Sequence, residues 1–128
     1  MLELKSRRAG ASILLITHNL AVVAETCDRV AVMYLGRVVE QAPSAALYRA
    51  PRHPYTEALL SAVPVPDPRR RAKRIVLDGD VADPSDPPPG CHFHPRCPEV
   101  RPECREQYPS LAATTGSHAV ACWLHAAR

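Results

Sequence analysis

Proline is the residue that most constrains this chain, because it is confined almost entirely to one part of it. Of the 14 prolines, only Pro43 falls in the first 50 residues, and all the others lie from Pro51 onward. Proline locks the backbone φ angle and removes an N–H donor, so helix interiors and central strands exclude it. We therefore expect the two ends of the chain to be built differently, with a boundary near residue 50.

Composition excludes several classes of protein. The 128 residues suffice for one ordinary domain or two small pieces. No apolar run approaches the roughly 20 residues that span a bilayer, and the first residues contain no signal-peptide core, so we expect a soluble cytosolic chain. The net charge of +3 is too small to be typical of a nucleic-acid-binding protein. We interpret the basic run at residues 69–74 as a solvated linker.

Short patterns predict helices and strands along the chain. Residues 2–9 have helical composition. The apolar run Ser12–Thr17 predicts a strand buried on both faces, as in a parallel sheet. The other expected elements are a helix from an Asn19 cap to Cys27, a hairpin of residues 29–35 and 38–40 with a Gly36–Arg37 turn, helices at 45–49 (capped by Ser44) and 54–63, and strands at 75–77 and 119–124.

His18 is the first candidate site residue. It follows the predicted strand Ser12–Thr17, and in open α/β sheets ligands bind outside the carboxyl ends of the strands. Taken alone, such a histidine is more often a capping or packing residue.

The residues around His18 carry a family resemblance. Residues 14–20 closely resemble the switch-histidine segment of ABC ATPases, with Asn19 in place of the usual aspartate, and residues 23–40 resemble the helix and hairpin that follow it. The resemblance implies that His18 hydrogen-bonds the γ-phosphate of ATP and helps to align the attacking water, since phosphoryl transfer depends on positioning and charge stabilisation.

A second motif narrows the family. Residues 51–60, which contain His53-Pro54-Tyr55, resemble the His-Pro-Tyr segment of dipeptide and oligopeptide importers, which related nickel importers share. Alone, the motif would be a helix start with an aromatic residue. The resemblance implies that it packs an extension on the ATPase core.

The four C-terminal cysteines form the other candidate site. Cys91, Cys97, Cys104 and Cys122 are separated by five, six and 17 residues, whereas zinc fingers and ribbons offer pairs two to four residues apart. In a reducing compartment, clustered cysteines more often bind metal than form disulfides. An iron–sulfur cluster tolerates wider spacing; zinc and free thiols remain alternatives. Cys27 is expected in the core.

The importer resemblance extends over this segment and implies a [4Fe-4S] cluster on Cys91, Cys97, Cys104 and Cys122. The nearby histidines could join a zinc site, but surface or supporting roles are the expectation for them. They are His92, His94, His118 and His125.

The sequence also lacks the elements needed for ATP hydrolysis. There is no Gly-x-x-x-x-Gly-Lys-Ser/Thr loop, no ABC signature and no Asp-Glu pair after an apolar strand. Without them His18 has no pre-organised phosphate or magnesium to act on, so we expect the chain to be inactive by itself. Its unpaired apolar strands should make it marginally stable or prone to aggregation.

The resulting interpretation is an α/β fold: residues 1–50 as the end of a RecA-like ABC nucleotide-binding domain, and residues 51–128 as a Cys-rich extension. The resemblance implies ATP-driven import of dipeptides or oligopeptides, with ATP and Mg²⁺ used by the full-length subunit. It implies a second ATPase subunit, two permease subunits and an extracytoplasmic peptide-binding protein as partners, and a place on the cytoplasmic face of the bacterial membrane. The alternative is a stand-alone iron–sulfur or zinc protein that uses only residues 88–125.

Overall fold

The computed structural model describes residues 12–63 and 74–126, so the expected helix at 2–9 and most of the basic run lie outside it. Within these ranges no helix has both the length and the apolarity needed to cross a membrane. The elements are α2 (Leu20–Thr26), β1 (Arg29–Tyr34), β2 (Arg37–Pro43), α3 (Ser44–Arg49), α4 (Pro54–Ser61), the 3₁₀ turn η1 (His94–Arg96), α5 (Glu103–Glu106), β3 (Ala112–Thr115) and β4 (His118–Val120).

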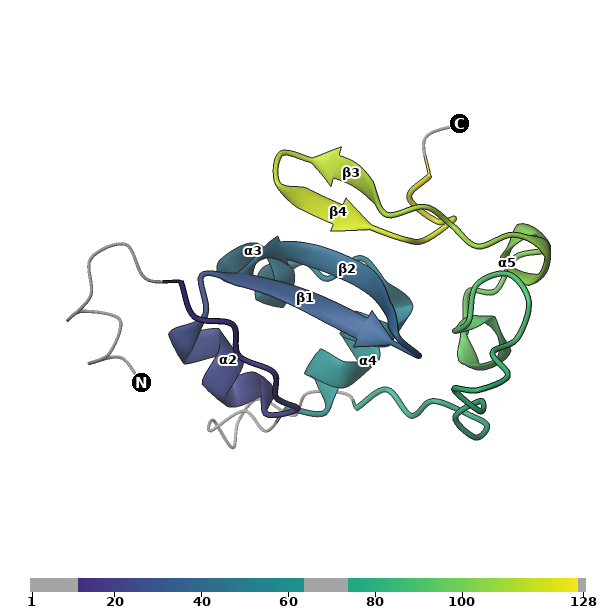
Figure 1. Ribbon diagram of the computed structural model, residues 1–128, viewed down its shortest axis with the longest axis horizontal. Helices are drawn as coiled ribbons and strands as arrows, with labels where there is room; N and C mark the ends of the chain where they lie inside the picture. The colour runs from purple at the N-terminus through teal and green to yellow at the C-terminus, as the bar shows by residue number, and fades with distance from the viewer. Residues whose placement is uncertain (1–11, 64–73, 127–128) are drawn as a thin grey trace.

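The strands form one sheet in the order β1-β2-β4-β3, and each neighbouring pair is antiparallel. The C-terminal hairpin β3–β4, yellow in Figure 1, therefore returns to lie beside β2 after the chain has passed through α5. Helix and strand are mixed, as the α/β expectation requires, but the parallel sheet expected of a RecA-like domain is not present among the described strands.

The N-terminal hairpin is the most accurately predicted element. Its turn lies at Leu35–Gly36, one residue earlier than expected, because Tyr34 pairs with Arg37. Both turn residues have positive φ, 43° at Leu35 and 75° at Gly36. Positive φ at both central positions matches the twist of the flanking strands, and glycine at the second position avoids one Cβ penalty.

A β-bulge interrupts the hairpin near its middle. Val32 pairs with Glu40, whereas Met33 pairs with Val38, so β2 has one residue more than β1 at this point. Side chains normally alternate between the faces of a strand, and the extra residue breaks that alternation. Val39 and Glu40 are consequently both buried, at 3% and 0% exposed.

The predicted strand at residues 12–17 is wrong for this structure. These residues adopt no regular secondary structure, and Leu14 and Ile16 are 89% and 90% exposed. A strand buried on both faces requires hydrogen-bonded neighbours, and no described strand pairs with this segment. The apolar pattern of these residues does not show whether a neighbouring strand is available to pair with them.

Three smaller expectations also differ from the structure. Residues 75–77 form no strand, and β4 ends at Val120 rather than at residue 124. Ser44 does not cap α3 but is its first residue, and the N-cap residue Pro43 makes no side-chain bond. By contrast, Asn19 caps α2 as expected, because its Oδ1 accepts from the Val22 N–H at 3.2 Å.

The core joins both ends of the chain. Its buried members come from the N-terminal hairpin, from α3 and from the Cys-rich segment: Val32, Tyr34, Val39, Ala42, Leu47, Cys91, Phe93 and Cys104. The proline-rich extension therefore does not stand apart from the hairpin.

Candidate functional site

The Glu40 carboxylate is fully buried and is surrounded by three hydrogen-bond donors. Oε1 accepts from the Arg52 backbone N–H at 2.8 Å and lies 2.7 Å from His118 Nε2, and Oε2 accepts from the His53 backbone N–H at 3.0 Å. We call Glu40, Arg52, His53 and His118 the Glu40 cluster. Because a buried carboxylate costs several kcal/mol unless it is hydrogen-bonded, these donors account for its place in the interior.

His53 caps α4 through its ring. Nδ1 accepts a hydrogen bond from the Tyr55 backbone N–H at 3.1 Å, and only an unprotonated ring nitrogen can accept. Burial lowers the pKa of His53 to about 4; the Glu40 carboxylate opposes this effect and His125 adds to it. His53 is therefore a neutral, structural imidazole at neutral pH.

The aromatic rings beside His53 connect α4 and β1 to the Cys-rich segment. The Phe93 ring centroid lies 5.3 Å from that of Tyr34, 5.4 Å from that of Tyr55 and 5.6 Å from that of His53. Such tilted and edge-on geometries are favourable for aromatic pairs. This is the packing contact expected of the His53-Pro54-Tyr55 segment.

Three of the four C-terminal cysteines belong to one local unit. Cys91 donates its N–H to the Cys104 carbonyl at 2.8 Å, and Cys97 donates its N–H to the His94 carbonyl at 3.3 Å. Cys91 Sγ accepts from the N–H groups of Phe93 and His94, Cys97 Sγ from that of Glu99 and Cys104 Sγ from that of Arg101. Burial raises the pKa of the Cys91 and Cys97 thiols, and the N–H groups directed at their sulfurs oppose this shift without cancelling it.

Cys122 reaches the same region from β4. Burial raises the pKa of the Cys122 thiol to about 11; the Leu124 N–H opposes this shift, and the neighbouring Cys97, Cys91 and Cys104 thiols raise it further. The four thiols are thus close enough to interact electrostatically. All five cysteines of the chain are free.

The arrangement does not form a site for a single metal ion. In residues 12–63 and 74–126, no three His, Cys, Asp or Glu side chains converge as ligands of one metal ion. Neither zinc nor an iron–sulfur cluster gains support from this geometry, and the ligand role of the four cysteines stays a prediction.

His18 was expected at the C-terminal end of a buried strand, but no strand precedes it in the structure. It lies immediately before Asn19, the N-cap of α2, and its side chain is exposed. Its expected ligand, the γ-phosphate of ATP, would require groups that this chain does not contain. The phosphate contact of His18 therefore stays a prediction as well.

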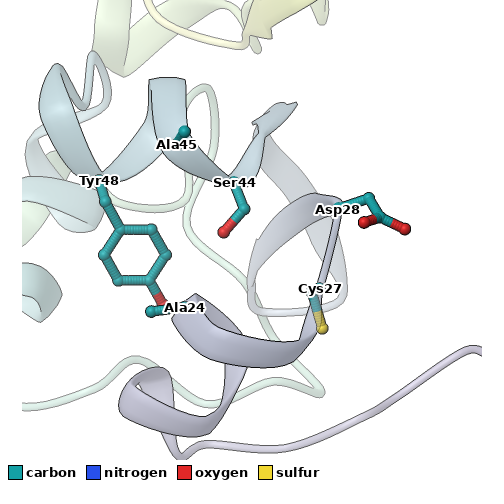
Figure 2. A pocket seen from close by; sticks show the side chains of 6 residues that line it. All are labelled: Ala24, Cys27, Asp28, Ser44, Ala45 and Tyr48. Carbon is teal, nitrogen blue, oxygen red and sulfur yellow. The ribbon is translucent and has the colours of Figure 1, made fainter. Parts of the chain in front are cut away.

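Cys27 was expected in the core, but the structure does not place it there. It is half-buried and lines an open pocket of about 400 Å³ between α2 and α3 (Figure 2). Tyr48 closes one side of this pocket, and its hydroxyl donates to the Leu20 carbonyl. Burial, and to a lesser degree Cys27, raises the pKa of Tyr48. The other lining residues are Ala24, Asp28, Ser44 and Ala45.

The Glu40 cluster was missed at the level of sequence. Its one visible signal is a glutamate at the end of an apolar pair, Val38-Val39, inside a predicted strand. Nothing local identifies His118 as its partner, because the two residues are 78 positions apart in the sequence.

Comparison with known proteins decides the family. Residues 39–104 match the family described as the oligopeptide/dipeptide transporter C-terminal region. The chain belongs to this transporter family. The match begins at Val39, beside Glu40, and ends at Cys104, so it includes the His53-Pro54-Tyr55 segment and three of the four clustered cysteines.

Relatives of the chain carry names of the same kind. The chain is 49% identical over 120 residues to a probable peptide ABC transporter ATP-binding protein, y4tS, of Sinorhizobium fredii, which covers 94% of this chain and 34% of the relative. It is 45% identical over 127 residues to the putative oligopeptide transport ATP-binding protein YkfD of Bacillus subtilis, covering 98% and 39%. The chain thus spans a little over a third of these relatives' length, and no comparison supports a stand-alone metal-binding protein.

Proposed function

We propose that this chain is the C-terminal part of the ATP-binding subunit of an ABC importer for dipeptides or oligopeptides. The alignment over 94% of the chain with a peptide ABC transporter ATP-binding protein carries this proposal. Because the alignment covers 120 residues of this chain, His18 lies within the aligned region. The proposed function is therefore that of a whole subunit, to which this chain contributes one part.

In that subunit His18 would contact the γ-phosphate of ATP. Its position directly before a capped helix gives its backbone a defined direction, and its exposure leaves the imidazole accessible to a nucleotide bound by other parts of the subunit. The glycine loop and the carboxylates that hold ATP and Mg²⁺ would come from those parts. Transport would require a second ATPase subunit, two permease subunits and an extracytoplasmic peptide-binding protein, at the cytoplasmic face of the membrane.

A chimera tests this proposal. The corresponding C-terminal third of the B. subtilis YkfD protein is replaced by this chain, and peptide uptake and ATP hydrolysis are measured in cells and membranes that lack the native subunit. We expect activity with the chimera and a loss of about 100-fold or more in ATP hydrolysis with His18→Ala, because positioning groups contribute effects of this size. The exposed Glu25→Gln variant is the matched control. A folded, assembled chimera that hydrolyses ATP equally well with and without His18 would refute the assignment of that residue.

We propose further that Cys91, Cys97, Cys104 and Cys122 hold a [4Fe-4S] cluster. Supporting this are the mutual electrostatic influence of the thiols and the backbone N–H groups directed at their sulfurs. Hydrogen bonds to sulfur are among the factors that tune such clusters. A four-iron cluster is larger than one ion, so its thiolates need not converge as tightly as zinc ligands. When bound, the cluster would have a structural or redox-sensing role.

Metal analysis after anaerobic purification decides the cofactor. We expect about four iron and four sulfide per chain, and a broad absorption near about 400 nm. Replacing Cys104 by serine should remove most of the iron, whereas Cys27→Ser, which removes the one cysteine outside the group, should retain it. One zinc without sulfide would overturn the cluster assignment.

A further inference from the structure

We propose that Glu40 is a positioning residue for the four-cysteine site, because it holds β4, the strand that leads to Cys122, against the rest of the molecule. This inference rests on the proposed role of the four cysteines. It concerns how the site is assembled from two separate parts of the chain.

The first part is self-contained. Cys91 and Cys104 are joined by a backbone hydrogen bond, and the chain at Gly90 passes so close to α5 that a Cβ there would lie 2.4 Å from the Cys104 carbonyl oxygen. Cys97 follows within the 3₁₀ turn η1 and its cap. Local contacts therefore fix these three thiols relative to one another, and the segment as a whole packs on the core.

Cys122 depends on the sheet instead. It follows β4 by two residues, and β4 has only three residues, paired with β2 at Glu40 and Gln41. β4 also pairs with β3, but a two-stranded hairpin is marginal by itself. Two further contacts hold it on β2: His118 Nε2 lies 2.7 Å from Glu40 Oε1 in the protein interior, and the backbone N–H of Ala121 donates to the Val39 carbonyl at 2.8 Å.

The same carboxylate also reaches the first part. Glu40 Oε2 accepts from the His53 N–H, and the His53 ring packs on Phe93, two residues beyond Cys91. Glu40 is thus bonded on one side to the strand that leads to Cys122 and on the other to the residue that supports the Cys91 segment. Two further hydrogen bonds hold the residues after Cys122: Trp123 Nε1 donates to the Gln107 carbonyl at 3.0 Å, and His125 Nε2 lies 3.0 Å from the Arg52 carbonyl oxygen. Both are exposed to solvent, where their net contribution is small.

Site-resolved alkylation of the full metal-free, reduced chain tests the proposal. Each cysteine lies in a different sequence context, so mass spectrometry can follow all five rates separately. In Glu40→Gln the acceptor loses its negative charge, which weakens the His118 contact whichever way the amide is oriented. The amide nitrogen cannot accept a hydrogen bond, so at least one of the three donors also loses its partner. We expect Cys122 to react about tenfold faster, as for a local opening eased by one lost hydrogen bond, and the other four thiols to change by less than about twofold. The exposed Glu57→Gln is the matched control.

Unchanged Cys122 reactivity in a Glu40→Gln chain with native circular dichroism would overturn the proposal and leave the positioning to the contacts of Ala121, Trp123 and His125. If Glu40→Gln fails to fold, so that all five thiols react as in denaturant, His118→Asn decides the question: it removes only the β4 end of the contact, and a rate for Cys122 equal to wild type would then overturn the proposal.

Iron and sulfide content separates this inference from the cofactor assignment. If the wild-type chain takes up the cluster, Glu40→Gln should lose iron to a chelator several-fold faster than Glu57→Gln, and equal rates would count against the proposal. If the wild-type chain takes up no iron, the cofactor assignment fails, while the alkylation rates still decide whether Glu40 positions Cys122.

Discussion

His118 Nε2 and Glu40 Oε1 lie 2.7 Å apart although the two residues are 78 positions apart in the sequence, and both side chains are buried. This contact joins the last strand of the chain to the first hairpin, so the sheet combines strands from both sides of residue 50 (Figure 1). The proline-rich segment between them connects two parts of one folded unit.

The buried His53 makes stability depend on pH. Its folded-state pKa is about 4, below the ordinary value of 6.5, so the unfolded chain binds a proton at this site more readily than the folded chain does. Stability is therefore complete above about pH 6.5 and falls as the pH drops toward 4, by up to about 3 kcal/mol from this residue. Glu40 and His125 are the charged or titratable groups that act on it.

Urea unfolding at pH 7 and pH 4.5 checks this expectation. His53→Asn is the appropriate comparison, because asparagine can still cap α4 but does not titrate. The loss of stability between the two pH values should be smaller in the variant by about 2 kcal/mol. Identical pH profiles would show that His53 does not cause the acid sensitivity.

Gly90 should tolerate no side chain. Its φ is 68°, and a Cβ would lie 2.4 Å from the Cys104 carbonyl oxygen, so Gly90→Ala adds a backbone clash to the cost of a left-handed conformation. Gly36 has a similar φ of 75° with nothing within 4 Å of the added atom. We expect Gly36→Ala to cost about 1 kcal/mol and Gly90→Ala about 3 kcal/mol or more, measured by thermal unfolding. Equal costs would mean that the close approach at Gly90 can relax.

Two tyrosines should respond to loss of the hydroxyl with opposite signs. The Tyr34 hydroxyl is buried without a hydrogen-bond partner, whereas the Tyr48 hydroxyl donates to the Leu20 carbonyl. Tyr34→Phe should therefore stabilise the fold by about 1 kcal/mol, and Tyr48→Phe should destabilise it by a similar amount. Urea midpoints at neutral pH would show the difference, and a destabilised Tyr34→Phe would indicate a partner such as a bound water.

Asn19 and Ser44 test which of the two predicted helix caps is used. Asn19→Ala removes the acceptor of the Val22 N–H and should cost about 1 kcal/mol, whereas Ser44→Ala removes no capping bond and should change stability by less than about 0.5 kcal/mol. Helix content by circular dichroism, together with unfolding midpoints, distinguishes the two. A larger loss with Ser44→Ala would restore the sequence-based assignment of that cap.

The sequence predicted what local patterns determine. The β1–β2 hairpin and helices α2, α3 and α4 follow from alternating apolar residues, caps and a proline at the first helical position, all of which act over a few residues. The prediction of a strand at residues 12–17 was wrong, because the stability of such a strand depends on neighbouring strands that no local pattern specifies. Strand β3 was missed because Ala112 to Thr115 is short and only weakly apolar.

The candidate site likewise contains residues that the sequence identified and residues that only the structure revealed. The family resemblance identified Cys91, Cys97, Cys104 and Cys122, and the structure adds that they interact electrostatically, but their ligand role stays a prediction. The Glu40 cluster could not be predicted, because its carboxylate looks like an ordinary hairpin residue until Arg52, His53 and His118 are placed around it. A buried carboxylate is recognisable only once the fold supplies its donors.

The bulge at Val38–Glu40 makes the length of this hairpin as important as its composition. Because one additional residue places Val39 and Glu40 on the interior together, deleting Val39 would restore simple alternation and move every residue on one side of the deletion to the opposite face of the strand. Either the carboxylate or the apolar residues before it would then point to solvent. Relatives that keep the Glu40 contact should therefore accept many substitutions in this strand but no single-residue insertions or deletions.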